Sequence, residues 1–269
     1  MKTGRRKIQR NVDWRALRSW VILAALLMPL TLLEVRAHAQ SGKNGPASSG
    51  KVSAPADLTG HWVSVVTQNW RLRMVTPPKG DYLGIPMTME SKRIADAWDP
   101  ASDEAAGNQC KGYGAAIIMT LPERVHITWQ DDNTMRMDVD AGMQTRLFHF
   151  GNWKPSAVKA TWQGDSVAEW VSRRGPGIPP AAPRSKYLKV TTTNMLPGYL
   201  RKNGVPYSEK AVLTEYFDLI HEAGGELWLI VTTIVNDPIY LDDSLILSAQ
   251  FRKQADAAGW DPTPCSARW

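Results

Sequence analysis

The stretch VHITWQDDNTMRMDVDAGMQTRLFHF, residues 125–150, alternates apolar and polar side chains through three segments separated by two turn sequences. Such alternation predicts antiparallel strands with one buried face, and the turn sequences lie at 131–133 and 140–142. A three-residue loop at each turn fixes the register of the strands. This register places eight residues on one apolar face: Val125, Ile127, Trp129, Met135, Met137, Val139, Met143 and Leu147. We therefore expect this face to line the inside of a β-layer, with Arg146 on the opposite, polar face.

Short runs rich in Val, Ile, Thr and aromatic residues recur between turn signals along the rest of the chain. They predict further strands near 61–67, 115–120, 157–163, 166–171, 186–194, 211–219, 226–235 and 245–252. A helix is predicted over 88–98, because Ile94, Ala97 and Trp98 share one face and Asp99-Pro100 ends it. The predicted fold class is all-β: an antiparallel barrel with one short helix and long loops, in a single domain over residues 57–269.

Two polar residues are expected on the inward face. His149 continues the series that contains Met143 and Leu147, so the alternation directs it inside. A two-residue turn at Gly164-Asp165 pairs strand 157–163 with strand 166–171 and directs Glu169 inside as well. A buried carboxylate must find a partner or raise its pKa, which is one way of making a general acid or base. His149 and Glu169 are therefore candidate catalytic residues; the alternatives are satisfied core groups, or a bulge that turns Glu169 outward.

Residues 1–39 are typical of a secretory signal peptide. A basic head precedes the apolar run 20–33, and Ala37-His38-Ala39 is an A-x-A cleavage sequence. We expect Sec-type export to the periplasm or the outside of the cell, with cleavage near Ala39. An uncleaved anchor, which would be the only contact with a membrane, and a twin-arginine route through Arg5-Arg6 are the alternatives.

Removal of this segment changes the charge of the chain. It holds 8 of the 32 Lys and Arg residues and 2 of the 26 Asp and Glu residues, so 24 of each remain. A formally neutral mature chain gives no reason to expect nucleic acid as a partner. Residues 40–56 are rich in Gly, Ser and Pro and are predicted to form a disordered leader.

The mature chain contains two cysteines, Cys110 and Cys265. In an oxidising compartment these are expected to form a disulfide that ties the Pro-rich tail to the segment NQCKGYG. Closing a loop of this length stabilises a fold by about 4–5 kcal/mol in the chain-entropy model. The alternative is two separate buried thiols.

At DLTGHW the chain resembles the lipocalins and related calycin barrels, whose first strand opens with a Gly-x-Trp pair, here Gly60 and Trp62. The resemblance implies a late basic residue that stacks on the tryptophan, for which Arg252 is the candidate. About 55 residues separate the first strand from the next predicted pair, much more than in a lipocalin. Longer stretches, such as WVSVVTQNWRLRMVTPPKGDY and YLRKNGVPYS, resemble a group of exported bacterial proteins without an assigned activity.

The many aromatic residues indicate a cavity for a small organic ligand, although core packing explains them equally. The expected lining residues are Trp129, Met135, Met137 and Trp162. Two loops are candidate lids over a barrel mouth: residues 69–86, with Arg73 and Tyr82, and residues 196–208, with Tyr199.

The sequence contains no nucleophile elbow, phosphate loop or paired Cys-x-x-Cys, and its four mature histidines are scattered, so no metal or cofactor is expected. Our first hypothesis is a periplasmic, lipocalin-like barrel that binds a small hydrophobic or aromatic molecule. The alternatives are a cofactor-independent isomerase, cyclase or hydrolase that uses His149 and Glu169, and a structural partner of an envelope complex.

Overall fold

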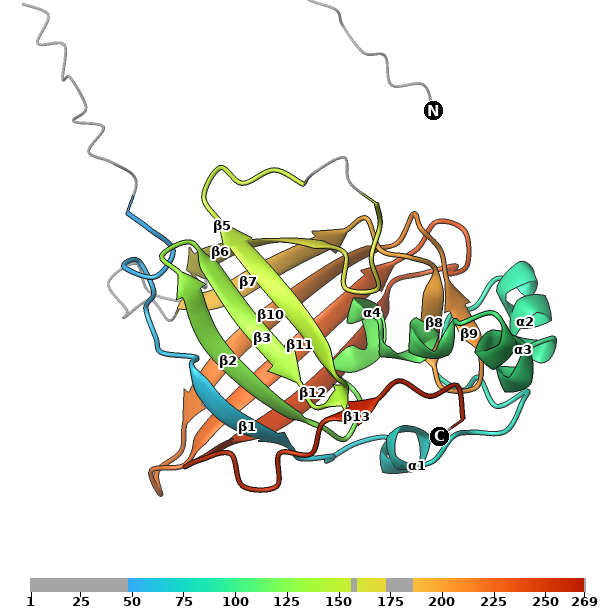
Figure 1. Cartoon of the computed structure of the whole chain (residues 1–269), viewed down its shortest axis with the longest axis horizontal. Coiled ribbons are helices and arrows are strands. Elements are labelled where there is room, and N and C mark those ends of the chain that lie inside the picture. The colour runs from blue at the N-terminus through green and yellow to red at the C-terminus, as the bar shows by residue number, and fades with distance from the viewer. Residues whose placement is uncertain (1–47, 156–158, 173–185, 269) are drawn as a thin grey trace, which may run out of the picture. The chain divides into compact units, whose positions relative to one another are not determined.

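The computed structural model describes residues 48–155, 159–172 and 186–268. Within these ranges nine strands close into a barrel in the order β1-β12-β11-β10-β7-β6-β5-β3-β2, which confirms the predicted all-β class (Figure 1). Neighbouring strands are antiparallel except β5 and β6, which are parallel. The barrel strands are β1 Gly60–Ser64, β2 Arg124–Asp131, β3 Thr134–Val139, β5 Gln144–Phe150, β6 Asp165–Ser172, β7 Lys186–Thr193, β10 Val212–His221, β11 Leu227–Asn236 and β12 Leu245–Gln254.

The predicted strands at 115–120 and 157–163 are wrong. Ala115–Ile118 forms the short helix α4, whose four residues are all buried, so this apolar run has no alternation that could distinguish a strand from a helical turn. Residues 157 and 158 lie outside the described residues, and the rest of that segment forms only an isolated bridge from Thr161 to Met195.

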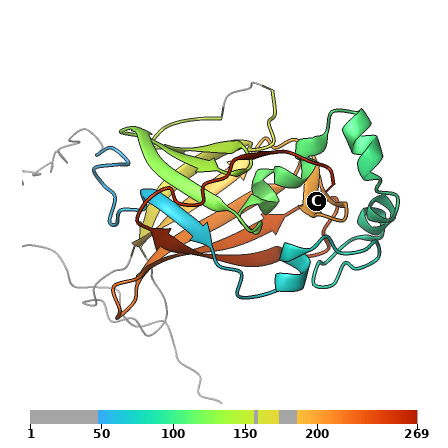
Figure 2. The ribbon, with the colours of Figure 1, turned by 60° about the horizontal axis from the view of Figure 1, so that its bottom comes forward.

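The predicted helix is confirmed as α2, Met89–Asp96, with the Thr88 side chain accepting a hydrogen bond from Ser91 N as its N-cap. Three further helical elements were not predicted: α1 Trp70–Met74, α3 Pro100–Ala105 and the 3-10 helix η1 Gln109–Tyr113. A hairpin outside the barrel was not predicted either, and it consists of β8 Gly198–Arg201 and β9 Val205–Tyr207. Helices α1 to α3 and the β8–β9 hairpin gather at one end of the barrel, as Figures 1 and 2 show. We call residues 65–123 and 194–211 together the cap.

The predicted register between β2 and β3 is confirmed, with Val125, Ile127 and Trp129 opposite Val139, Met137 and Met135. The predicted register between β3 and β5 is wrong by one residue, because Val139 pairs with Gln144 across a four-residue connection, 140–143. Gly142 and Met143 both have positive φ values, of 73° and 52°. The whole strand is therefore turned over: Arg146 points inside with Phe148 and Phe150, whereas Leu147 and His149 alternate with them on the outer face.

Trp62 is fully buried at the base of the barrel, and its Nε1 donates to Leu58 O over 3.0 Å. The basic residue above its ring is Lys253, with Nζ 4.6 Å from the ring centroid, so the expectation for Arg252 is wrong. Alternation along β12 directs Phe251 and Lys253 to one face and Arg252 to the other, where it is exposed. Gly60 has a φ of 108°, and a Cβ there would meet Lys253 Nζ at 2.9 Å, so the glycine leaves room for this stack.

Packed structure begins earlier than the expected boundary at Asp57. Gly50 N donates to Asn133 Oδ1, and Trp170 Nε1 donates to Gly50 O, both over 2.8 Å. At the other end of the chain, β13 Thr263–Pro264 pairs in parallel with β4 Ala141–Gly142. The predicted Cys110–Cys265 disulfide is confirmed and joins the tail to η1.

Candidate ligand-binding site

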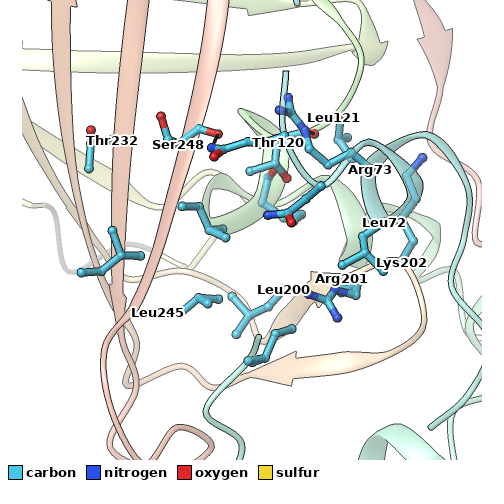
Figure 3. Close-up of a pocket in the computed structure, with 16 residues that line it drawn as sticks. Leu72, Arg73, Thr120, Leu121, Leu200, Arg201, Lys202, Thr232, Leu245 and Ser248 are labelled. Atoms are coloured by element: carbon cyan, nitrogen blue, oxygen red, sulfur yellow. Dashed lines mark hydrogen bonds between the residues drawn. The ribbon is translucent and has the colours of Figure 1, made fainter. Parts of the chain in front are cut away.

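A cavity of about 240 Å³ lies between the cap and the barrel wall, where β1 ends (Figure 3). The last residue of β1 that pairs with β12 is Ser64, which lies opposite Phe251. Beyond it the chain leaves the wall and touches β12 through Val65 N to Gln250 O and Gln68 Nε2 to Ser248 O. The earlier half of β12 therefore pairs with β11 along one edge and borders the cavity along the other, where β1 no longer continues.

Sixteen described residues line the cavity. Eight are aliphatic, and they form the largest part of the wall: Leu72, Ile85, Ile117, Leu121, Leu200, Leu245, Ile246 and Leu247. Three are cationic, namely Arg73, Arg201 and Lys202, and five are neutral polar residues, namely Gln68, Asn69, Thr120, Thr232 and Ser248. Figure 3 shows Leu72, Arg73 and Lys202 on the cap side, across from Thr232 and Ser248 on β11 and β12.

The two predicted lid loops hold each other in place around this cavity. Arg201 of β8 donates to the backbone oxygens of Asp81 and Leu83, over 3.3 Å and 2.9 Å. Asn203, which is fully buried, donates through Nδ2 to Pro78 O at 3.0 Å and Asp81 O at 3.1 Å. Arg71 also forms a 2.8 Å ion pair with Asp81. The loops are thus one connected layer, and both contribute lining residues.

Burial controls the electrostatics of the cavity. The pKa values of Arg73, Arg201 and Lys202 are all lowered, chiefly because burial disfavours their charged forms. Arg73 also interacts electrostatically with Glu123, whose carboxylate oxygens are buried and have no hydrogen-bond partner among the described residues. Burial raises the pKa of Glu123 well above its ordinary value, with a further contribution from Asp140 that Arg73 partly opposes. Burial therefore favours the neutral, protonated form of Glu123.

This buried acid makes stability depend on pH. The unfolded chain releases the Glu123 proton above about pH 4.5, whereas the folded protein retains it to higher pH, so ionisation favours unfolding as pH rises through this window. Glu123→Gln is expected to raise the melting temperature at pH 7.5 by a few degrees and to give no gain at pH 4. Glu169→Gln, at a side chain that is 60 % exposed, is the control and is expected to change little. Melting curves at both pH values test this, and an equal gain at pH 4 would contradict it.

Of the seven residues predicted to bind a ligand, Arg73 is the one found among the described lining residues. Met135 and Met137 are buried in the barrel core, and Trp129 packs against that core with its ring 5.3 Å from that of Phe150. The other three lie in or beside the cap. Tyr82 donates to Asp96 and Tyr199 to Asp103, both over 2.6 Å, while the backbone oxygen of Trp162 accepts from Ala115 N.

The two candidate catalytic residues do not point into the barrel. His149 lies on the outer face of β5, where its ring stacks on Trp153 at 4.1 Å. Glu169 of β6 is exposed and forms a 2.8 Å ion pair with Lys189 of β7. The expected inward direction is wrong for His149 because of the register shift of β5, and for Glu169 because β6 pairs with β5 and β7 rather than with the segment at 157–163. The structure therefore does not support His149 and Glu169 as an acid-base pair inside the barrel.

The aliphatic half of the wall is not predicted from the sequence. Aromatic side chains inside the barrel are the predicted lining, whereas the described lining residues include no Trp, Tyr or Phe. The available signal is the aliphatic content of the two lid loops, where Leu72 and Leu200 each lie beside an arginine. Apolar side chains in a long polar loop indicate that the loop packs on something.

The fold and site define a closed β-barrel with a capped side cavity, which agrees in outline with a lipocalin-like barrel. Comparison with protein-family models, with curated proteins and with solved structures gave no match. In the described ranges, no helix combines the length and apolar character needed to cross a bilayer. The same residues contain no cluster of three or more His, Cys, Asp or Glu side chains that could hold a metal ion.

Proposed function

We propose that this chain is an exported, lipocalin-like protein that binds a small apolar molecule in the cavity between the cap and β12. The observation that carries the proposal is the cavity itself: about 240 Å³ lined by eight aliphatic and eight polar or charged residues. In pockets for small organic ligands, apolar walls supply affinity and polar groups set orientation.

The interior of the barrel gives additional support for this location. The inward residues of β2, β3 and β5 are packed into one buried cluster that includes Ile127, Met137 and Phe148. Among the described residues the wall opens where β1 ends, and there a separate layer of chain covers it. Export rests on the signal sequence at 1–39, and the Cys110–Cys265 disulfide is consistent with an oxidising compartment.

Binding is tested with the neutral fluorophore N-phenyl-1-naphthylamine, whose emission rises in an apolar site. The wild-type protein is expected to bind it. Leu72→Ala removes part of the apolar wall, worth about 1–2 kcal/mol, and is expected to weaken binding about fivefold to thirtyfold. Trp70→Ala on the same helix is the matched control, because Trp70 is 65 % exposed and is not a lining residue. No binding to the wild-type protein, or an equal loss in both variants, would contradict the proposal.

A further inference from the structure

The charged side chains that line the cavity are all cationic. Its described lining residues include Arg73, Arg201 and Lys202, and no carboxylate. Arg201 donates to two backbone oxygens and has the Asp81 carboxylate as a nearby counter-charge. A buried, charged donor without an acceptor is costly, so such a donor at a cavity wall favours an anionic ligand group.

Arg73 is the most buried of these cations, with 8 % of its surface exposed. Its Nε donates to Thr120 O over 2.6 Å, and its Nη2 lies 3.4 Å from Ser64 Oγ. Its Nη1 is buried and has no hydrogen-bond partner among the described residues. The guanidinium is therefore held in a fixed position at the cavity wall with a donor that remains to be satisfied.

The neighbouring acid does not satisfy the Nη1 donor of Arg73. Glu123 is close enough to influence the pKa of Arg73, yet no hydrogen bond joins the two side chains in the described structure. Burial raises the pKa of Glu123, and neither of its carboxylate oxygens accepts a hydrogen bond from Arg73. The Arg73 Nη1 donor is therefore left for a group that comes from outside the chain.

We propose that the ligand of this cavity is an amphipathic anion: an apolar chain against Leu72, Leu200 and Leu245 and one acidic headgroup against Arg73, on the side shared with Lys202. This inference rests on the proposed function and specifies its ligand class. A carboxylate or a sulfate monoester has the required chemistry, because each accepts charge-assisted hydrogen bonds from a guanidinium. The apolar chain follows the β12 side of the cavity, where Leu245 and Leu247 lie.

The test compares ligands of equal chain length that differ in charge. Octanoate, octyl sulfate, octan-1-ol and octylammonium compete with N-phenyl-1-naphthylamine at pH 7.5 and 150 mM salt. Octanoate or octyl sulfate is expected to bind at least about tenfold more tightly than octan-1-ol, and octylammonium the least tightly. If both anions bind, the site recognises a single negative charge; if octanoate alone binds, it recognises a carboxylate.

Substitutions test whether Arg73 is the residue that contacts the acidic headgroup of the ligand. Arg73→Met is expected to weaken octanoate binding by about tenfold or more and octan-1-ol binding by less than about twofold. Arg71→Met on the same helix is the matched control, since Arg71 is 53 % exposed and is paired with Asp81 outside the cavity lining. If Arg73→Met does not fold, the same comparison of octanoate with octan-1-ol is made with Lys202→Met, which is expected to weaken octanoate binding more than octan-1-ol binding.

The outcomes separate the two proposals. Octan-1-ol and the dye binding as tightly as octanoate, or equal effects of Arg73→Met and Arg71→Met, would overturn the anion proposal and leave the apolar site standing. Failure of the dye and all four competitors to bind would overturn the proposed function itself.

Discussion

Arg146→Met is expected to lower the free energy of unfolding by about 3–5 kcal/mol, a large share of the stability of a single domain. Arg146 of β5 and Glu215 of β10 form an ion pair across the barrel interior, and both side chains are fully buried. Arg146 Nη1 donates to Glu215 Oε1 over 2.9 Å, and the guanidinium lies 5.0 Å from the centroid of the Phe148 ring. Removing the arginine leaves a carboxylate deep in an apolar core without its partner.

The control removes both charges. Arg146→Met combined with Glu215→Leu is expected to recover most of the lost stability, because well-packed apolar side chains replace a buried ion pair at little cost. Urea unfolding at pH 7 followed by tryptophan fluorescence gives the free energies for the single and the double variant. A loss below about 1 kcal/mol in Arg146→Met would show that this pair does not lie in the interior as described.

Reduction of the disulfide is expected to lower the free energy of unfolding by about 4–5 kcal/mol in the chain-entropy model. Cys110 and Cys265 are 155 residues apart in the sequence, so the bond removes many conformations from the unfolded chain. It also secures the tail, where β13 pairs with β4 and the Arg268 side chain contacts Glu104. Losing the bond frees this segment from the cap.

Urea unfolding with and without dithiothreitol measures this effect. Cys110→Ser, Cys265→Ser and the double variant are expected to unfold alike and to be insensitive to the reductant. Equal stability of the oxidised and the reduced wild-type protein would contradict the prediction.

The barrel was predictable from the sequence where strands alternate strictly and are joined by tight turns. Val125, Ile127 and Trp129 have apolar partners in only one register with Met135, Met137 and Val139, and that register is the one observed. The two cysteines likewise had one possible partner each. In the first case a local pattern leaves a single register, and in the second the number of cysteines leaves a single pairing.

The register of β5 was not predictable in the same way, because it depends on the backbone of a four-residue turn. Gly142 and Met143 adopt positive φ values, and the methionine in this strained conformation is exposed. A sequence pattern cannot show that a non-glycine residue takes this conformation. Because of this one-residue shift, Arg146 lies on the inner face and His149 on the outer face, the reverse of the prediction. The buried ion pair was therefore not predicted, and His149 was wrongly predicted as a catalytic residue.

The site was only partly predictable, because it forms between segments that are far apart in the sequence. The length and composition of the lid loops predict their place over the cavity, and Arg73 of the first loop lines it. The opening beside β12 arises because β1 stops pairing at Ser64, and no local feature marks that residue. The aliphatic wall therefore depends on the packing of the cap against β11 and β12, which the sequence pattern does not predict.

The most direct test of the account is a crystal structure of the protein with 8-bromooctanoate, with the bromine located by its anomalous scattering. The account predicts a bromine peak among Leu72, Leu200 and Leu245 and a carboxylate in contact with Arg73. Bromine found only on the outer surface or inside the packed barrel, with the cavity beside β12 left without ligand, would contradict it.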